Sequence, residues 1–225
     1  MIQLLRLTLR QIKRIPMSNK HFFFFFFFLA SIIAPQNAVA KTDDNEKYET
    51  FIVNLGNNVI QILINKDEKM FKRKESFRSE IQGHFALKSI GRFILARYWR
   101  RMNEKQQQEY LQLFEDAVIE NYAAQFDDYD NEKLIIKSSR ETTDGGIVVK
   151  SDIRRPGKGE PLHIDWKVFN TKRGLKVLDV IVNNVSMSIT LRNEYASAIQ
   201  SRGSIEGFLD YLREKIRNDQ KALKN

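Results

Sequence analysis

The spacing of apolar residues changes twice along the chain and divides it into three parts. Up to residue 126 apolar residues recur every three or four positions, which places them on one face of a helix. From 134 to 185 they alternate with polar residues, as is typical of β-strands, and the helical spacing returns after 188. Helices followed by an antiparallel run of strands and further helices predict an α+β domain.

The first helical part is expected to begin with two separate helices. Residues 41–47 are polar and predicted to be frayed. A first helix is then expected over residues 48–65 and a second, more charged helix over 69–81. Gly83 is predicted to end the second helix.

Residues 84–126 carry a wide apolar stripe and are expected to form two helices separated by a break at residues 101–103. Asn103, followed three positions later by Gln106, is a capping box that is expected to start the second helix. Aromatic and aliphatic side chains of both helices form the stripe: Phe85, Ile90, Phe93, Ile94, Tyr98, Tyr110, Phe114, Val118 and Tyr122.

Turn sequences rich in glycine divide the strand part into about four strands. The last of them, residues 175–185, is apolar on both faces and is therefore predicted to be central and covered on both sides. Ser188 is expected to cap the helix that follows, which stops at Gly203, and Ser204 is expected to start the final helix. The three turns are predicted at 144–146, 155–159 and 172–174.

Residues 1–40 have the pattern of a secretory signal peptide. A basic region precedes the apolar run 22–34, and Ala38-Val39-Ala40 is a small-x-small cleavage site. The apolar run, about thirteen residues, is too short for a membrane span. Cleavage after Ala40 is predicted to leave one domain of residues 41–225, with an uncleaved anchor as the alternative; Met17 is a possible second start.

Composition excludes several classes of protein. The chain has 37 Lys and Arg against 28 Asp and Glu, and five of the basic residues lie in residues 1–40. From Lys41 onward, 32 basic residues therefore stand against 28 acidic ones. This near balance disfavours a nucleic-acid binder. Because the chain has no cysteine, disulfides and thiolate metal sites are impossible. Because one of its three histidines lies in the leader, a multi-histidine metal site is nearly excluded. No metal or cofactor is expected.

Candidate catalytic groups are sparse. Asp179, a charged residue in an apolar strand, could be a buried general base, although a structural acid is favoured. His163 lies two residues from Asp165 on one strand face, where a solvated polar face is the favoured interpretation. The stripe of residues 84–126 either fills a solid core or lines a cavity, and periodicity alone favours the core.

Five segments together resemble the MlaC family, also called the toluene-tolerance auxiliary family. Residues 91–99 (GRFILARYW) resemble its "vLGryW" signature, and 161–166 (PLHIDW) resemble its "pi.vdy" strand. Residues 178–186 (LDVIVNNVS) are similar to "kv.DV.veGvS", 191–195 to "nyR.qF", and 203–212 to its last helix.

The resemblance covers about residues 48–216 in the family's order. Departures are Ala96 in place of glycine, Leu175 where tryptophan is common, and Asn184 in place of glycine. A turn at Asn184 that requires a positive φ would be strained.

The resemblance implies a periplasmic phospholipid carrier without a cofactor. Its expected partners are phospholipid, an inner-membrane ABC transporter complex with its substrate-binding domain protein, and an outer-membrane lipoprotein–porin complex. Such a carrier would maintain the lipid asymmetry of the outer membrane. Helices packed on a twisted, mostly antiparallel sheet would enclose an apolar pocket.

Stripe positions then suggest which residues hold the lipid. Two alternatives remain: a cone-fold isomerase-like enzyme with Asp179 as base, and a secreted interaction module with a filled core. The predicted lining is Phe85, Ile90, Phe93, Ile94, Tyr110, Phe114, Tyr122, Val149, Ile153, Ile164, Trp166, Val168, Val182 and Val185.

Overall fold

The structure is a computed structural model that describes residues 43–222 apart from 125, 130 and 158. The predicted leader and its cleavage site lie outside these residues. The described elements, in chain order, are α2 (Asp43–Ile64), α3 (Met70–His84), α4 (Leu87–Leu95), the 3-10 turn η1 (Trp99–Arg101), α5 (Glu104–Ala123), the 3-10 turn η2 (Phe126–Asp128), β1 (Lys133–Glu141), β2 (Ile147–Arg154), β3 (Leu162–Thr171), β4 (Gly174–Val182), β5 (Val185–Ser186), α6 (Met187–Arg202) and α7 (Ile205–Ala222).

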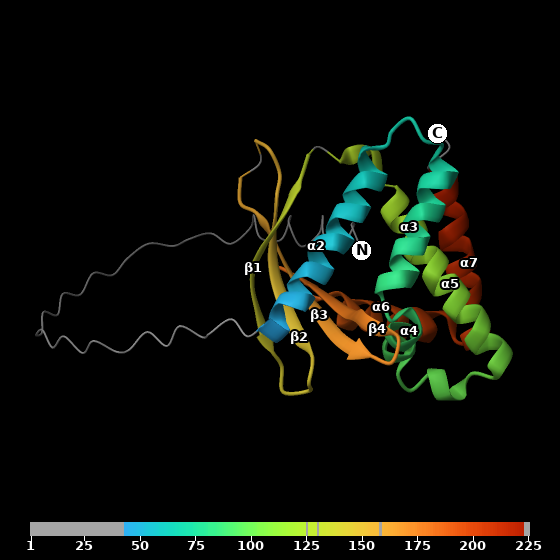
Figure 1. The fold of residues 1–225 in the computed structure, drawn as a ribbon. Coiled ribbons are helices and arrows are strands. Elements are labelled where there is room, and N and C mark those ends of the chain that lie inside the picture. The colour runs from blue at the N-terminus through green and yellow to red at the C-terminus, as the bar shows by residue number, and fades with distance from the viewer. Residues whose placement is uncertain (1–42, 125, 130, 158, 223–225) are drawn as a thin grey trace, which may run out of the picture. The chain divides into compact units, whose positions relative to one another are not determined.

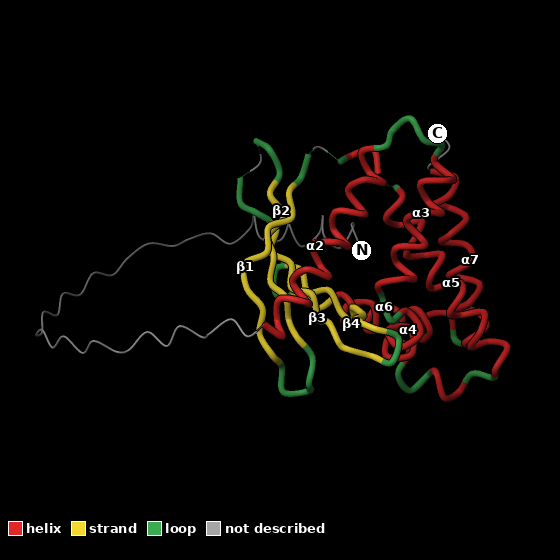
Figure 2. The backbone as a smooth tube through the Cα atoms, in the orientation of Figure 1, coloured by secondary structure: helices red, strands yellow, loops and turns green. Residues whose placement is uncertain are grey.

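The strands form one antiparallel sheet in the order β1-β2-β3-β4-β5, and the helices precede and follow the strands along the chain (Figure 2). Helix α2 lies across β1 and β2, whereas α3, α5 and α7 stand beside one another away from the sheet (Figure 1). The α+β class is confirmed, with a fifth strand of two residues beyond the expected four.

Helix α2 can approach the sheet closely because Gly56 has no side chain. A Cβ atom at Gly56 would lie 2.5 Å from Cδ2 of Leu134 on β1, which is inside van der Waals contact. The face of the sheet that α2 covers is called the inner face below. Register places Val149 opposite Trp166, and Trp166 opposite Val180, on this face.

Several sequence-predicted boundaries differ from the structure. Gly83 does not end the second helix, which continues to His84, and the first helix starts five residues earlier than predicted, at Asp43. The helix that begins the 84–126 segment ends at Leu95, because Ala96 adopts a positive φ of 48°. The capping box of Asn103 is confirmed, with backbone-to-side-chain bonds of 2.9 and 3.1 Å to Gln106.

The predicted last strand, 175–185, is two strands. It ends at Val182, and Asn183 and Asn184 turn the chain with φ values of 46° and 66°, so that β5 pairs back onto β4. Strand β4 therefore lies next to the short edge strand and is not central. Asparagine tolerates this left-handed region better than most residues, which explains how a turn replaces the expected straight strand.

The helical core is formed by α4, α5, α6 and α7 and contains no residue of the sheet. Gly91 on α4 lets α5 come close, and the hydroxyl of Tyr110 donates a hydrogen bond of 3.1 Å to the Gly91 carbonyl. The buried members of the helical core are Ile94, Leu95, Tyr98, Met102, Tyr110, Phe114, Tyr195, Ile199, Phe208, Leu209 and Leu212.

Two further cores contain the remaining clusters of buried apolar side chains. The sheet core joins α2 to the inner face, and the α3–α5 core joins α3, α5 and η2. Phe85 and Val59 are half-buried and pack against both of them. The buried members are Tyr48, Ile52, Leu55, Ile147, Val149, Val168 and Val177 in the sheet core, and Phe77, Ile81, Ile119, Ala123 and Phe126 in the α3–α5 core.

Gly91→Val is expected to lower the free energy of unfolding by about 2 kcal/mol, because overpacking forces neighbouring side chains apart. A Cβ at Gly91 would already lie 3.0 Å from Leu111 and 3.3 Å from Phe114, before the valine methyl groups are added. Urea unfolding followed by circular dichroism measures the change. Gly83→Val is the matched control: Gly83 is helical and exposed with nothing within 4 Å, so its change should stay within about 0.5 kcal/mol. Equal losses in the two variants would contradict the close α4–α5 contact.

Tyr122→Phe is expected to flatten the loss of stability at alkaline pH. Burial raises the pKa of the Tyr122 hydroxyl to about 12, above the ordinary value of 10.0. As pH rises from 10 towards 12, the unfolded chain releases this proton and the folded chain retains it, so the free energy of unfolding falls. The contribution of one such group is on the order of 1 kcal/mol per pH unit. Urea unfolding at several pH values in this window measures the slope.

Tyr98→Phe is the control of opposite sign. The guanidinium of Arg97 donates a hydrogen bond of 3.1 Å to the Tyr98 oxygen and lowers its pKa, so the ionised tyrosine stabilises the fold at high pH. This difference in proton binding lies below the unfolded pKa of about 10. Removing the hydroxyl should therefore abolish a rise of stability below pH 10 and leave the slope between pH 10 and 12 as in the unmodified protein. A Tyr122→Phe slope identical to that of the unmodified protein would contradict a buried, protonated hydroxyl.

Candidate functional site

The sheet residues of the predicted lining all lie on the inner face. Register aligns Ile164 with Val182, and Val182 with Val185 of β5, in a row across three strands. The same register places Ile153 opposite Leu162 on this face. The structure thus brings together Val149, Ile153, Ile164, Trp166, Val168, Val182 and Val185.

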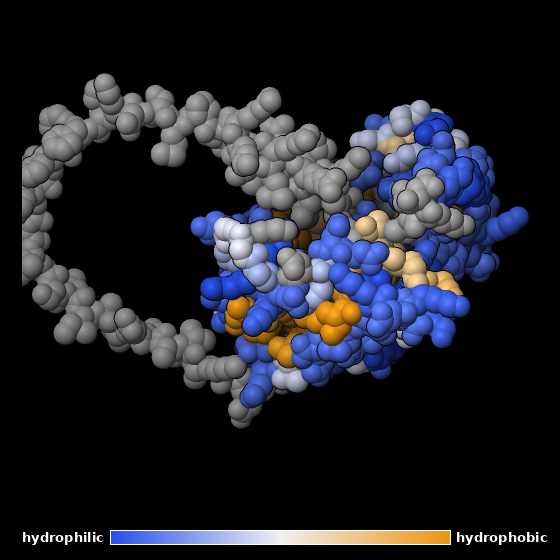
Figure 3. All heavy atoms as spheres, turned by 90° about the horizontal axis from the view of Figure 1, so that it is seen from above, coloured by the Kyte–Doolittle hydropathy of each residue, from blue (hydrophilic) through white to orange (hydrophobic). Residues whose placement is uncertain are grey.

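Only part of the inner face is covered by the cores. Val149 and Val168 are completely buried in the sheet core, and Trp166 packs against it. Ile153 and Val182 are half-buried and belong to none of the three cores, and Val185 is 42% exposed. Seen from above, from the end where β2 turns into β3, apolar surface gathers over the sheet and α2 among polar surface (Figure 3).

Two residues that were predicted to line the pocket from the helices lie beside the sheet or against an adjoining core. Phe85 lies beside β4, and Tyr122 lies against the α3–α5 core. Phe85 forms a parallel bridge with Val177 of β4, and the N–H of Ala86 donates to the Val177 carbonyl at 3.0 Å. The Phe85 side chain packs against both the sheet core and the α3–α5 core. Tyr122 packs against the α3–α5 core, with its ring 5.9 Å from that of Phe77.

The other helical residues of the predicted lining are not brought to the sheet. Ile94, Tyr110 and Phe114 are at most 2% exposed inside the helical core, and Ile90 packs against the same core. Phe93 points outward: it is 45% exposed, and the guanidinium of Arg192 lies 5.2 Å from its ring. The residues of the stripe therefore pack into two different cores and, at Phe93, lie on the outer surface.

The inner face keeps its polar atoms paired within the sheet. The indole N–H of Trp166 donates to Oγ of Ser151 at 2.9 Å, and the Ser151 hydroxyl donates to the Ile164 carbonyl at 3.0 Å. Ser151 is 2% exposed, so an unpaired donor there would be costly. The alternation of apolar residues in β2 did not indicate this role of Ser151. Its hydrogen bonds follow from its position opposite Ile164.

The candidate catalytic groups have structural partners. Asp179 accepts from the backbone N–H groups of Val180 and Ser188, each at 3.0 Å, and from the Ser186 hydroxyl at 2.5 Å. Ser186, and not Ser188 as predicted, caps α6. Asp179 is thus the structural acid that the sequence favoured.

His163 pairs with a different aspartate from Asp165, its near neighbour on the strand. His163 contacts Asp152, directly opposite on β2, at 2.7 Å, and not Asp165. Its side chain is 63% exposed, in agreement with a solvated polar face. Among the residues that the structure describes, no group of three His, Cys, Asp or Glu is placed to hold a metal ion.

An open pocket of about 580 Å³ lies where the start of α4, the α5 face and the β3–β4 turn meet. Phe85, Leu87 and Leu111 give it an apolar wall, and four basic residues surround that wall. No motif in the sequence indicates this pocket, because its residues come from segments far apart in the chain. The basic residues are Lys88, Lys172, Arg173 and Lys176.

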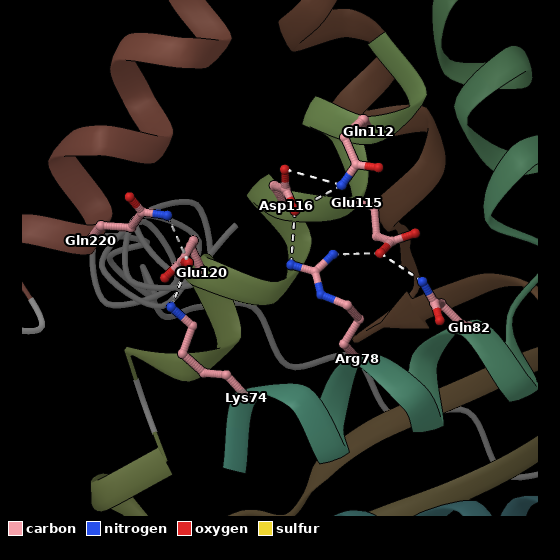
Figure 4. Close-up of polar contacts among 8 residues, drawn as sticks. All are labelled: Lys74, Arg78, Gln82, Gln112, Glu115, Asp116, Glu120 and Gln220. Atoms are coloured by element: carbon pink, nitrogen blue, oxygen red, sulfur yellow. Dashed lines mark hydrogen bonds and ion pairs between the residues drawn. The ribbon is translucent and has the colours of Figure 1, made fainter. Parts of the chain in front are cut away.

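A polar seam holds α3 against α5 beside this pocket (Figure 4). The guanidinium of Arg78 contacts Glu115 and, at 2.8 Å, Asp116, while Gln82 donates to Glu115 at 2.9 Å. Further along, Lys74 and Gln220 donate to the buried Glu120, the latter at 3.0 Å. Two cations thus face three carboxylates in this seam, and Oε2 of Glu120 is buried without a hydrogen-bond partner among the described residues.

Comparisons with known proteins identify a family from the sequence and a known fold from the structure. A curated relative, the intermembrane phospholipid transport system binding protein MlaC of Haemophilus influenzae, is 24% identical over 113 residues, or 49% of this chain and 53% of the relative. The chain thus matches about half the length of that relative. A solved phospholipid-binding protein of Ralstonia solanacearum, in complex with a phospholipid, shares the fold with a TM-score of 0.68 at 23% identity, over 76% of this chain and 97% of that one.

No helix in the described part of the chain is both long and apolar enough to span a bilayer. A sequence model of the family described as MlaC protein matches residues 54–214, which is more than two thirds of the chain and the same region that carries the motif resemblance. The chain belongs to the MlaC family.

Proposed function

We propose that this protein binds a phospholipid and carries it between two membranes, with its acyl chains held against the inner face of the sheet. The observation that carries the proposal is the part of that face outside the packed cores, where Ile153 and Val182 are half-buried. Family membership and the names of the two relatives, a phospholipid transport binding protein and a phospholipid-binding protein, support the same ligand class.

Acyl chains need an apolar surface, and the inner face presents one. A phospholipid carries about thirty methylene groups, and exposing them to water costs on the order of 20 kcal/mol. The carrier must therefore match the bilayer in polarity, so that transfer between the two is nearly balanced. Because the Trp166 indole is paired with Ser151, no unsatisfied polar group opposes an acyl chain there.

The lining that we propose is narrower than the one suggested by stripe positions. It consists of the inner-face residues together with Phe85 and Tyr122, which border the sheet core and the α3–α5 core. Ile94, Tyr110 and Phe114 would support this lining from the helical core without touching the lipid.

Location and partners follow from the same proposal. Residues 1–40 would direct export and be removed after Ala40, leaving residues 41–225 as a single domain in the periplasm. An inner-membrane ABC transporter complex and an outer-membrane lipoprotein–porin complex would exchange the lipid and maintain outer-membrane asymmetry. Since the protein holds the lipid without breaking a bond, no catalytic group is required, and Asp179 is already committed to backbone and hydroxyl donors.

Val182→Trp is expected to lower the amount of co-purified phospholipid at least severalfold, because the indole would fill space on the inner face that an acyl chain needs. Native mass spectrometry of the purified protein measures the bound lipid, and circular dichroism checks the fold. Ile135→Trp is the matched control: Ile135 is 37% exposed and lies on the opposite face of the sheet, so bound lipid should be unchanged. Protein that carries no lipid under gentle extraction would contradict the proposed function.

A further inference from the structure

Two segments that pack against each other carry almost only positive charge. Residues 81–103 and helix α6 contain seven Lys and Arg and a single acid, Glu194. In the rest of residues 41–225, 25 basic residues stand against 27 acidic ones. Helix α4, which belongs to the first segment, lies beside α6 (Figure 1). The excess positive charge of residues 41–225 is therefore gathered on one part of the fold.

Six of the seven cations have no carboxylate partner. Only Arg202 lies near an acid, 4.0 Å from Glu214, and the Oε2 atom of Glu194 is buried. In the part of the chain that the structure describes, the other six are exposed and make no ion pair: Lys88, Arg92, Arg97, Arg100, Arg101 and Arg192. Their charge is left for a partner outside the chain.

Aromatic rings hold several of these guanidinium groups in place. The guanidinium of Arg192 on α6 lies 5.2 Å from the ring of Phe93 on α4. Those of Arg97 and Arg101 lie 5.0 and 5.8 Å from the ring of Tyr98. These distances are typical of cation–π contacts. A guanidinium on a ring face keeps N–H donors at its edge, and these can bind an oxyanion in bidentate fashion.

Large apolar side chains are exposed next to these arginines. Phe93 is 45% exposed, and Ile189 in the first turn of α6 is 53% exposed. Ile189 precedes Arg192 by three residues, so the two lie on the same face of α6. Val185, 42% exposed at the edge of the inner face, lies four residues before Ile189. The arginine surface is defined as Phe93, Arg97, Arg101, Ile189 and Arg192.

We infer that the arginine surface docks the protein on the anionic surface of a phospholipid bilayer. Phosphate oxygens accept charge-assisted hydrogen bonds from arginine, and exposed aromatic and aliphatic side chains enter the boundary between head groups and acyl chains. Cations combined with such side chains are typical of elements that lie on a membrane surface.

The single sign of the surface favours a bilayer over an acidic protein. An acidic protein must present carboxylates at positions that match those of the cations. A bilayer presents phosphates over a whole plane, so arginines from separate segments need no such match. The inference goes beyond the proposed function, because it concerns where the protein rests and not what it holds. Since Ile189 follows Val185 closely, docking brings the β5 edge of the inner face towards the bilayer.

The test is flotation of the purified protein with vesicles of phosphatidylcholine, with and without phosphatidylglycerol. The unmodified protein is expected to float with the anionic vesicles at low salt, and much less with neutral vesicles or at high salt, where charges are screened. Arg97→Gln/Arg192→Gln should weaken binding to anionic vesicles on the order of tenfold, because each cation near an anionic lipid surface contributes severalfold to affinity. Phe93→Ser should weaken it severalfold, because it removes the exposed ring. Circular dichroism checks the fold of each variant.

Lys66→Gln/Lys69→Gln and Phe71→Ser are the matched controls. They remove the same charge and a ring that is 57% exposed from the α2–α3 turn and the first turn of α3, so vesicle binding should match that of the unmodified protein. If the arginine variant floats like the unmodified protein, the inference is overturned. If the lysine variant loses as much binding as the arginine variant, net charge and not the arginine surface determines docking, and the inference also fails. Equal binding to neutral and anionic vesicles overturns it as well.

Two further measurements separate this inference from its alternatives. Polyglutamate is titrated into the protein by calorimetry. Binding that the arginine variant loses, in a protein that floats with no vesicle, would assign the surface to an acidic protein and overturn the inference. Native mass spectrometry of the same samples measures co-purified phospholipid. A protein that floats with anionic vesicles but carries no lipid would contradict the proposed function and support docking, whereas one that carries lipid but never floats would overturn docking alone.

Discussion

The fold depends on how its apolar surfaces are shared between helices and sheet. An α+β domain is stable when each apolar face is buried against another element. Here α4, α5, α6 and α7 bury their aromatic residues against one another in the helical core, so these helices do not close over the sheet. Helix α2 and the chain at Phe85 are left to cover the inner face, and they cover only part of it. An apolar face of the sheet that is only partly covered follows from this division.

Local signals in the sequence predicted local structure well. The capping box at Asn103 starts α5, Asp144-Gly145-Gly146 turns β1 into β2 with Gly145 at a φ of 79°, and Gly203 ends α6 in the left-handed region. Each of these is determined by a few neighbouring residues, so spacing and residue type are sufficient to find it. Periodicity missed the turn at Asn183 and Asn184 because apolar residues continue on both sides of it, and a strand that is apolar on both faces has no alternation for a turn to interrupt.

The candidate site was harder to predict, for a physical reason. Periodicity shows that one face of a helix is buried but does not show which neighbour buries it. Tyr110 and Tyr122 belong to the same stripe on α5, yet Tyr110 lies in the helical core and Tyr122 against the α3–α5 core. The sheet was more predictable, because a period of two fixes which residues share a face, and all seven predicted strand residues do share one. The basic pocket could not be predicted, because its cations come from separate segments that only the fold brings together.

Burial of acyl chains has consequences for what a carrier can hold and for how it can release it. Apolar burial is non-directional and roughly proportional to area, so the inner face alone would hold any lipid of suitable length. Such a carrier would distinguish its cargo by the length and volume of the chains and not by their charge. Release would then require a partner whose surface is equally apolar, because transfer between two surfaces of similar polarity is nearly balanced.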